Sequence, residues 1–407
     1  MTFTCGIDWA ERHHDVALVD SDGATIAKKR IDTGVAGLAD LLALIAEHGG
    51  DPDTVPVAIE TDKNLIVVAL TAAGFTVYPI NPRAVARYRE RHGQAGGKSD
   101  PGDAIVLAHI LRTDREHHRP LPVSSDSALA IKALARQHQE AIWARQHTVN
   151  RLRSILIEYY PNALKAFPSL TMRSALTILA AAPSPARADQ LTVSRIAALL
   201  RKSGRGNRAG LAEKILADLT ADALRQAPPV EHALGQVAAG LVSIISTMET
   251  VIANLEDAMA VEFDRHQHAN LIRSAPGLGP ILAARVLAEI GDDPNRFTTA
   301  AGLRAFAGTA PITRASGRSK IVTARRVRNR RLADACHWWA FASLTKSPGA
   351  RAHYDRRRAA GDTHNAALRN LAHKLLGRLW WCLHNNQAWD DNAAWPDATS
   401  PPTEVAA

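Results

Sequence analysis

Residues 5–32 read CGIDWAERHHDVALVDSDGATIAKKRID, and residues 56–80 read PVAIETDKNLIVVALTAAGFTVYPI. The first stretch contains three short apolar runs separated by polar turns, which predicts three consecutive strands. An apolar helix is expected around residues 38–45, and the second stretch then reads as strand, helix, strand. Three strands in a hairpin meander followed by a strand–helix–strand unit is the order expected of an RNase-H-like mixed sheet. The predicted N-terminal fold is therefore α/β.

The length of 407 residues exceeds what one ordinary core supports, so we expect more than one domain. The predicted divisions are an α/β catalytic domain at 1–120, a helical coiled-coil linker at 121–268 with a small helical insert at about 168–230, a mostly α-helical domain at 269–385, and an unstructured tail at 386–407.

Heptad repeats support the coiled-coil prediction for the linker. The second long helix has two apolar rows with a period of seven, typical of a coiled coil. Leu234, Leu241, Met248 and Leu255 form one row, and Val237, Ile244, Val251 and Ala258 form the other. Another row, Ala135, Ile142, Val149 and Leu156, runs along the first long helix. The pattern leaves open whether the two helices pair with each other or dimerise.

Composition limits the compartment and the class of partner. Hydrophobic residues make up 46% and charged residues 22%, and no uncharged stretch reaches the ~18 residues that a membrane span needs, so we expect a cytoplasmic protein, associated with the nucleoid and not with a membrane. Cys5, Cys336 and Cys382 lack metal-site spacing and are expected to be buried. The net charge of +9 favours a polyanionic partner.

Four acidic residues occupy positions suited to a metal site. Asp8 lies within the first strand, where a carboxylate is disfavoured, and Glu60 ends the fourth. Asp100 and Asp103 open a helix at i and i+3, which places them on one face. Carboxylates are preferred ligands of Mg²⁺, which assists phosphodiester displacement, and Mn²⁺ is an alternative ion. Helix capping by Asp100 and a dipole interaction of Asp103 remain alternative explanations.

The C-terminal part carries the basic residues. Residues 294–333 contain ten Lys and Arg and no acid, which favours contact with nucleic acid. The turn SAPGLGP at 274–280 predicts backbone contacts to a phosphate, as in helix-hairpin-helix modules, or else a simple packing turn. The candidate nucleic-acid-binding residues are Lys98, Gly277, Gly279, Arg314, Arg318, Lys320, Arg325, Arg326, Arg328, Arg330 and Arg331.

A turn-rich loop at 310–320, APITRASGRSK, is expected to expose Ser316 between Arg314 and Arg318. A serine hydroxyl is a weak nucleophile, and the arginines would stabilise charge on an attacked phosphate. Spacing alone also fits an ordinary Ser-Gly turn, and Ser319 is nearby. Further along, the aromatic run His337, Trp338, Trp339 and Phe341 is interpreted as the buried face of one helix.

Taken together, these motifs resemble the DEDD transposases related to the Piv invertase, over residues 4–115 and 270–345. The shared features are Gly6-Ile-Asp8, Glu60, Lys98-Ser-Asp100-x-x-Asp103, Pro276-Gly-Leu-Gly279, Phe297, Ala307-Gly-x-x-Pro311 and Ser316-Gly. The resemblance implies a RuvC-like fold in which Asp8, Glu60, Asp100 and Asp103 bind Mg²⁺. It also implies that Ser316 is catalytic and forms a covalent 5′-phosphoserine with DNA.

The same resemblance implies an insertion-sequence recombinase guided by a structured bridge RNA that pairs with target and donor DNA. It further implies a homodimer or homotetramer with active sites shared between protomers. Two departures from the pattern are Arg328-Asn329, where a glycine is common before the polar residue, and the length of residues 168–230.

Three other interpretations stay open. The first is a RuvC-like nuclease or Holliday junction resolvase in which water attacks, and the second is a nucleic-acid-binding protein without catalysis. The third, a sugar-kinase-like ATPase, is disfavoured because the later Gly-rich phosphate loops are missing.

Overall fold

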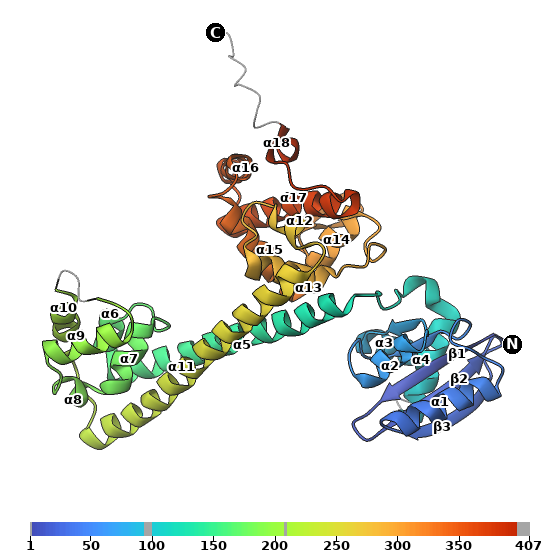
Figure 1. Ribbon diagram of the computed structural model, residues 1–407, viewed down its shortest axis with the longest axis horizontal. Coiled ribbons are helices and arrows are strands. Elements are labelled where there is room, and N and C mark those ends of the chain that lie inside the picture. The colour runs from blue at the N-terminus through green and yellow to red at the C-terminus, as the bar shows by residue number, and fades with distance from the viewer. Residues whose placement is uncertain (1, 93–99, 207–209, 397–407) are drawn as a thin grey trace, which may run out of the picture. The chain divides into compact units, whose positions relative to one another are not determined.

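The computed structural model describes residues 2–92, 100–206 and 210–396 (Figure 1). The chain divides into two compact units, Met1–Val123 and Ser124–Ala407. Each unit has its own hydrophobic clusters.

The first unit is built on a five-stranded mixed sheet in the order β3-β2-β1-β4-β5. The strands are β1 (Phe3–Trp9), β2 (His13–Asp20), β3 (Thr25–Asp32), β4 (Val57–Ile59) and β5 (Val77–Pro79). The first three pair antiparallel, and β4 pairs parallel with both β1 and β5. The predicted order of a hairpin meander beside parallel strands is confirmed.

Helices cover both faces of this sheet. They are α1 (Val35–Glu47), α2 (Leu65–Ala72), α3 (Pro82–His92) and α4 (Asp100–Asp114), followed by a short 3₁₀ turn, η1 (Arg115–His117). Ile7 and Ile59 point to the face that α1 and α2 cover, because they share a core with residues of these helices. Ala58 points to the opposite face, where it packs with residues of α3 and α4.

Two long helices, α5 (Asp126–Tyr159) and α11 (Pro228–Arg265), pack lengthwise in the second unit (Figure 1). One core joins the start of α5 and the end of α11 to the C-terminal helices, and a second joins the end of α5 and the start of α11 to the insert. The insert helices are α6 (Pro161–Ala166), α7 (Arg173–Ala181), α8 (Pro185–Ala188), α9 (Val193–Lys202) and α10 (Leu211–Leu219).

Of the two heptad rows predicted on α11, one is not covered by α5. Val237, Ile244 and Val251 are 42%, 47% and 44% exposed, although they were expected to fill a seam. The seam against α5 instead uses positions such as Ala238, Ile245 and Ile252, which are buried. By length and composition alone, α11 could cross a membrane. In the described residues, 28% of its most apolar window is buried.

The C-terminal helices carry one small sheet between them. They are α12 (Ala269–Arg273), α13 (Pro280–Ile290), α14 (Ala300–Ala307), α15 (Arg330–Ser343), α16 (Pro348–Ala359), α17 (His364–Asn385) and α18 (Asp391–Ala394), with β6 (Ile312–Ser316) and β7 (Ser319–Thr323) between α14 and α15.

Residues 386–396, expected to belong to an unstructured tail, are folded. Both carboxylate oxygens of Asp391 accept from Ser347 Oγ at 2.9 Å. Trp395 is buried, and its ring fills the space where Gly349 lacks a side chain. The aromatic residues in an otherwise polar segment anchor it. The rest of the predicted tail, 397–407, lies outside the described residues.

Candidate active site

Asp8 and Glu60 lie at the same edge of the N-terminal sheet. Ile7 and Ile59 are partners in the parallel β1–β4 ladder, so the next residue on each chain follows at the same level. Side chains alternate between faces along a strand, and both isoleucines point toward α1 and α2. Asp8 and Glu60 are therefore placed toward the α4 face, and both are partly buried.

Helix α4 crosses this face in contact with β1. Thr4 Oγ1 donates to Ala108 O at 2.9 Å, and a Cβ added to Gly6 would lie 2.0 Å from Ala104 O. Thr4 and Gly6 are two residues apart on β1, a distance of ~6.6 Å along the strand. They contact Ala108 and Ala104, which are four residues or ~6 Å apart along α4. The next step along this correspondence joins Asp8 to the first turn of α4, which begins at Asp100. The side chain of Asp100 and all of Lys98 lie outside the described residues.

Asp103 is held by an arginine. Its side chain is buried, and one carboxylate oxygen accepts from Nη2 of Arg89, which comes from α3. The Nε of Arg89 is buried without a hydrogen-bond partner. The sequence analysis missed this ion pair because fourteen residues separate the partners. Within the part of the chain that the structure describes, no three His, Cys, Asp or Glu residues form a group that could hold a metal ion.

A further carboxylate, Asp15, lies directly opposite Asp8 in the β1–β2 ladder and therefore on the same face. Asp15 is buried, and Arg30 of β3 donates hydrogen bonds to its carboxylate from Nε at 3.1 Å and from Nη2 at 2.9 Å. Two like charges opposite each other destabilise a sheet, and Arg30 offsets the repulsion. The signal in the sequence was an acid in the otherwise apolar run DVALV.

These oxygen donors suit a hard divalent cation. Asp8 and Glu60 each follow a residue of the Ile7–Ile59 pair, and carboxylate oxygens are the ligands that Mg²⁺ and Mn²⁺ accept. The α4 backbone brings its first turn to the level of Asp8, so the predicted tetrad is consistent with the local backbone arrangement.

Ser316 is exposed beside a turn, as expected, and the predicted loop is a regular hairpin with Ser316 at its tip. Ser316 and Ser319 are partners in the β6–β7 ladder, which leaves Gly317-Arg318 as a two-residue turn. Gly317 has φ +55°, which favours glycine. All of β6 and β7 except Ile312 is exposed. An isolated two-stranded ribbon is only marginally stable in water, so this hairpin is suited to ordering against a partner.

The basic residues around the hairpin differ in their surroundings. Those exposed are Arg314, Arg318, Lys320, Arg326, Arg328 and Arg330. Arg331 is partly buried, forms an ion pair with Glu140 and lies over the ring of Trp143, 5.8 Å from its centroid. Arg325 is also partly buried. Arg331 therefore contributes to the packing of α15 on α5, which its place in a charge run did not indicate.

The glycine turn before α13 is in part a packing turn. Gly277 has φ +84°, and an added Cβ would lie 2.7 Å from the backbone N of Ser343. Trp339 Nε1 donates to Pro276 O at 2.9 Å and fixes the same turn. Gly279, by contrast, is exposed at the start of α13 with open space around it. Of the two glycines, Gly279 is the one placed to meet a phosphate.

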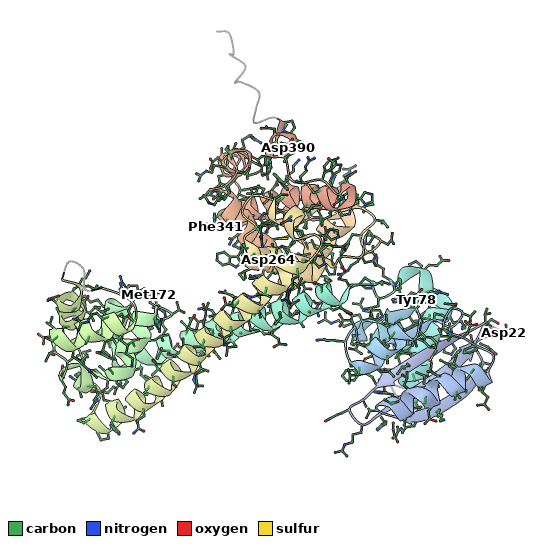
Figure 2. All side chains as sticks on the ribbon, in the orientation of Figure 1. Asp22, Tyr78, Met172, Asp264, Phe341 and Asp390 are labelled. Carbon is green, nitrogen blue, oxygen red and sulfur yellow. The ribbon has the colours of Figure 1, made fainter. Side chains whose placement is uncertain are left out.

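The aromatic run on α15 only partly forms a buried face. Trp339 is fully buried, whereas Trp338 and Phe341, which is labelled in Figure 2, are each 49% exposed. The helical period rotates adjacent residues by about 100°, so a run of four cannot all face one core. The prediction of a single buried face is therefore wrong for Trp338 and Phe341.

Asn329, where the sequence departs from the expected pattern, caps α15. Its Oδ1 accepts from the N–H of Leu332 at 2.9 Å, and its Nδ2 donates to Glu289 Oε2 at 2.7 Å. Glu289 is buried and also accepts two hydrogen bonds from Arg136 of α5. This network fixes the N-terminus of α15 immediately after the hairpin.

Comparison with known proteins gives two family matches. A transposase family of the DEDD type associated with IS110 matches residues 5–161, and a family described as "Transposase IS116/IS110/IS902 family" matches residues 269–355. The first includes Asp8, Glu60, Asp100 and Asp103, and the second includes Ser316.

Similar proteins cover nearly the whole chain. A mini-circle protein of Streptomyces coelicolor, named as the transposase for IS117, is 50% identical over 400 residues, 97% of each chain. A 42 kDa protein of insertion element IS900 from Mycobacterium paratuberculosis is 29% identical over 393 residues, 94% of this chain and 96% of its own length. The chain therefore belongs to the IS116/IS110/IS902 family of insertion-sequence transposases.

Proposed function

We propose that this transposase cleaves and rejoins DNA by metal-assisted transesterification, with Asp8, Glu60, Asp100 and Asp103 as a DEDD metal site and Ser316 as the nucleophile. The support for the proposal is that Asp8 and Glu60 follow the paired residues Ile7 and Ile59 of the parallel β1–β4 ladder, and that Gly6 lets the backbone of α4 lie against β1. An RNase-H-like, RuvC-like fold is the natural interpretation of this sheet.

The proposed chemistry divides between the four carboxylates of the first unit and the hairpin that carries Ser316. A bound Mg²⁺ or Mn²⁺ would neutralise the attacked phosphate and stabilise the leaving oxygen. Ser316 Oγ forms a bond to phosphorus while the bond from phosphorus to the 3′ oxygen breaks, and the serine proton ends, overall, on that 3′ oxygen. Arg314 and Arg318 flank Ser316 along the ribbon and are exposed, so they can face the phosphate oxygens.

The resulting phosphoserine ester conserves the energy of the phosphodiester bond. Attack by another strand's 3′ hydroxyl then rejoins the DNA without ATP. Gly279, Arg314, Arg318, Lys320, Arg326, Arg328 and Arg330 are proposed to bind the DNA backbone, together with Lys98.

The test is covalent capture of DNA by the full-length protein. Purified protein is incubated with Mg²⁺, flanking transcript and end-labelled element-junction DNA, then analysed on a denaturing gel with and without protease. We expect a protease-sensitive band that Ser316→Ala abolishes. Ser319→Ala is the matched control, because Ser319 is the exposed partner of Ser316 across the same turn, and it should retain the band.

A second arm tests the metal site. Asp8→Asn should lower cleavage at least a hundredfold in Mg²⁺ while leaving DNA affinity within about twofold. Cleavage that persists in Ser316→Ala with free hydrolysed ends would favour a RuvC-like endonuclease instead. Tight binding without cleavage by any variant would favour a non-catalytic nucleic-acid-binding protein.

A guide RNA is a separate part of the proposal, and the support for it is the resemblance stated from the sequence together with the net charge of +9. Sequencing of RNA that copurifies with the protein should recover one transcript from the flank of the element. Recovery of unselected cellular RNA would contradict it. We expect the protein to act in the cytoplasm, on nucleoid DNA.

We also propose that the protein works as a dimer or tetramer. The support is the outward apolar row on α11, which repeats every seven residues and is left uncovered by α5. β-Branched residues at such positions favour two-stranded pairing.

A further inference from the structure

A basic cavity of about 480 Å³ lies at the base of the Ser316 hairpin. Its lining comes from α5, the end of α14, the start of α15 and one side of α17. The residues that matter for its chemistry are Trp143, Arg328, Arg330, Asn365 and Arg369. Arg369 and Trp143 lie outside the 294–333 basic stretch, so the sequence alone did not connect them with it.

The charge of the cavity is not neutralised from within. Among the residues that the structure describes, no carboxylate pairs with Arg328, Arg330 or Arg369. The one acid in the lining, Asp334, is already bound by the buried Arg285 at 2.6 Å. Three arginines line one hollow, and Arg328 Nη1 donates to the carbonyl of Arg325 at 3.3 Å. An anion bound there would balance their positive charge.

An indole gives the cavity a second kind of recognition. Trp143 lines it, and the guanidinium groups of Arg330 and Arg331 lie 5.7 Å and 5.8 Å from the centroid of its ring. Aromatic rings and arginine planes are the surfaces on which unpaired nucleobases stack. An anion site beside a stacking surface suits a nucleotide better than an isolated phosphate.

The cavity is connected to the hairpin by the chain itself. Thr309 lines it just before β6, and Arg328 lines it just after β7. A Cβ added to Gly308 would lie 2.1 Å from Cδ of Arg328, so the glycine allows the arginine to lie across this junction. The seven residues from Thr309 to Ser316 reach at most ~23 Å, which equals roughly four to seven nucleotides of a strand.

We propose that this cavity binds one nucleotide of the DNA strand whose phosphate is presented to Ser316. The phosphate lies among Arg328, Arg330 and Arg369, and the base lies against Trp143. The bound nucleotide is roughly four to seven positions from the cleaved bond. The inference rests on the proposed function for the choice of strand, and it assigns that strand an anchoring point.

Photo-crosslinking tests the position. A single 5-iodo-2′-deoxyuridine is placed at successive positions of end-labelled junction DNA, and the crosslinked peptides of the full-length protein are identified by mass spectrometry. We expect crosslinks to the peptide containing Trp143 only from positions about four to seven nucleotides from the cleaved phosphate. Crosslinks to other peptides alone, or to Trp143 from every position equally, would overturn the proposal.

Charge removal tests the anion site. Arg330→Gln/Arg369→Gln should weaken DNA binding about tenfold at moderate salt and reduce the slope of log affinity against log salt by about 1.5 to 2. The matched control is Arg356→Gln/Arg358→Gln, which removes two charges from α16 outside the cavity and should change affinity less than twofold. Equal losses in the two double variants would reject a specific site.

The remaining arms separate the alternatives. The Trp143→Phe variant should keep most of the DNA affinity of the native protein, whereas the Trp143→Ala variant should lose most of it. Thermal unfolding of both variants confirms that they fold. An RNA strand of the same sequence that crosslinks in place of the DNA would overturn the assignment to DNA. Because these measurements read binding, they remain informative if Ser316→Ala retains cleavage and the proposed nucleophile is wrong.

Discussion

The missing side chain of Gly6 determines how closely α4 approaches the strand that carries Asp8. Its position lets the backbone of α4 rest directly on β1, since any Cβ would lie 2.0 Å from Ala104 O and 2.5 Å from Ala108 N. Both obstructing atoms belong to the helix backbone, so no side-chain rotation relieves the clash. The distance between Asp8 and the first turn of α4 therefore depends on this glycine.

Replacing Gly6 by Ala should lower the free energy of unfolding by about 1–3 kcal/mol or more, because α4 must move away from the sheet. DNA cleavage should fall with it as Asp100 and Asp103 shift from Asp8. Urea denaturation and cleavage assays of the full-length protein measure the two effects.

Gly240→Ala is the control for that substitution. Gly240 is exposed within α11 with no atom within 4 Å of an added Cβ, so alanine should stabilise the helix by about 0.5–1 kcal/mol. A Gly6→Ala variant as stable and active as the native protein would contradict the close packing of α4.

At the scale of elements, Glu231 connects the insert to the start of α11. Its carboxylate accepts from Arg225 Nε at 2.8 Å and Nη2 at 2.9 Å, and from the N–H of Ala186 at 3.0 Å. The hydrogen bonds from Arg225 lower the pKa of Glu231 and outweigh burial, which raises it; the Ala186 N–H lowers it further. Glu231 is therefore charged throughout the neutral range.

The pH dependence follows from that direction. A carboxyl group with a lowered pKa in the folded state stabilises the protein above its unfolded pKa, about 4.3, and the stabilisation is lost as pH falls through the folded value. We expect Glu231→Gln to cost about 1–3 kcal/mol at pH 7 and less at pH 3. Urea denaturation at several pH values measures this.

Glu213→Gln, at an exposed position of α10 in the same insert, provides the comparison and should leave the pH profile unchanged. If Glu231→Gln and the native protein lost stability in parallel between pH 6 and pH 3, the ion pair would not be the source of the acid sensitivity.

For the whole molecule, the two units carry different parts of the proposed chemistry. Asp8, Glu60, Asp100 and Asp103 belong to the first unit, and Ser316 belongs to the second. The outward row on α11 is the surface that we assign to a second copy of the chain.

Ile244→Lys should weaken self-association at least tenfold, because a charged side chain in an apolar helix interface must be desolvated. Sedimentation velocity over a range of protein concentrations measures the change. Ser243→Lys, at the adjacent exposed position but off the row, should leave it unaltered. Equal effects of the two lysines would place the interface elsewhere.

The amino-acid sequence by itself determined the elements and their order. Short apolar runs separated by polar turns mark β1, β2 and β3, and the apolar run before Glu60 marks β4, because strand propensity and turn signals are local properties. The same local reasoning placed Asp8 and Glu60 at strand positions that disfavour acids; in the structure Asp8 lies within β1, and Glu60 follows directly after the last residue of the neighbouring β4. The helical character of α5 and α11 also follows from local periodicity.

Only the tertiary structure decided which faces and which distant residues meet. A heptad pattern gives spacing but does not say which row a partner covers, so Val237 was placed in a seam although Ala238 occupies it. The Arg89–Asp103 and Arg30–Asp15 pairs, and the cavity between Trp143 and Arg369, join residues far apart along the chain. Such contacts arise when packing brings separate elements together, and no local pattern encodes them.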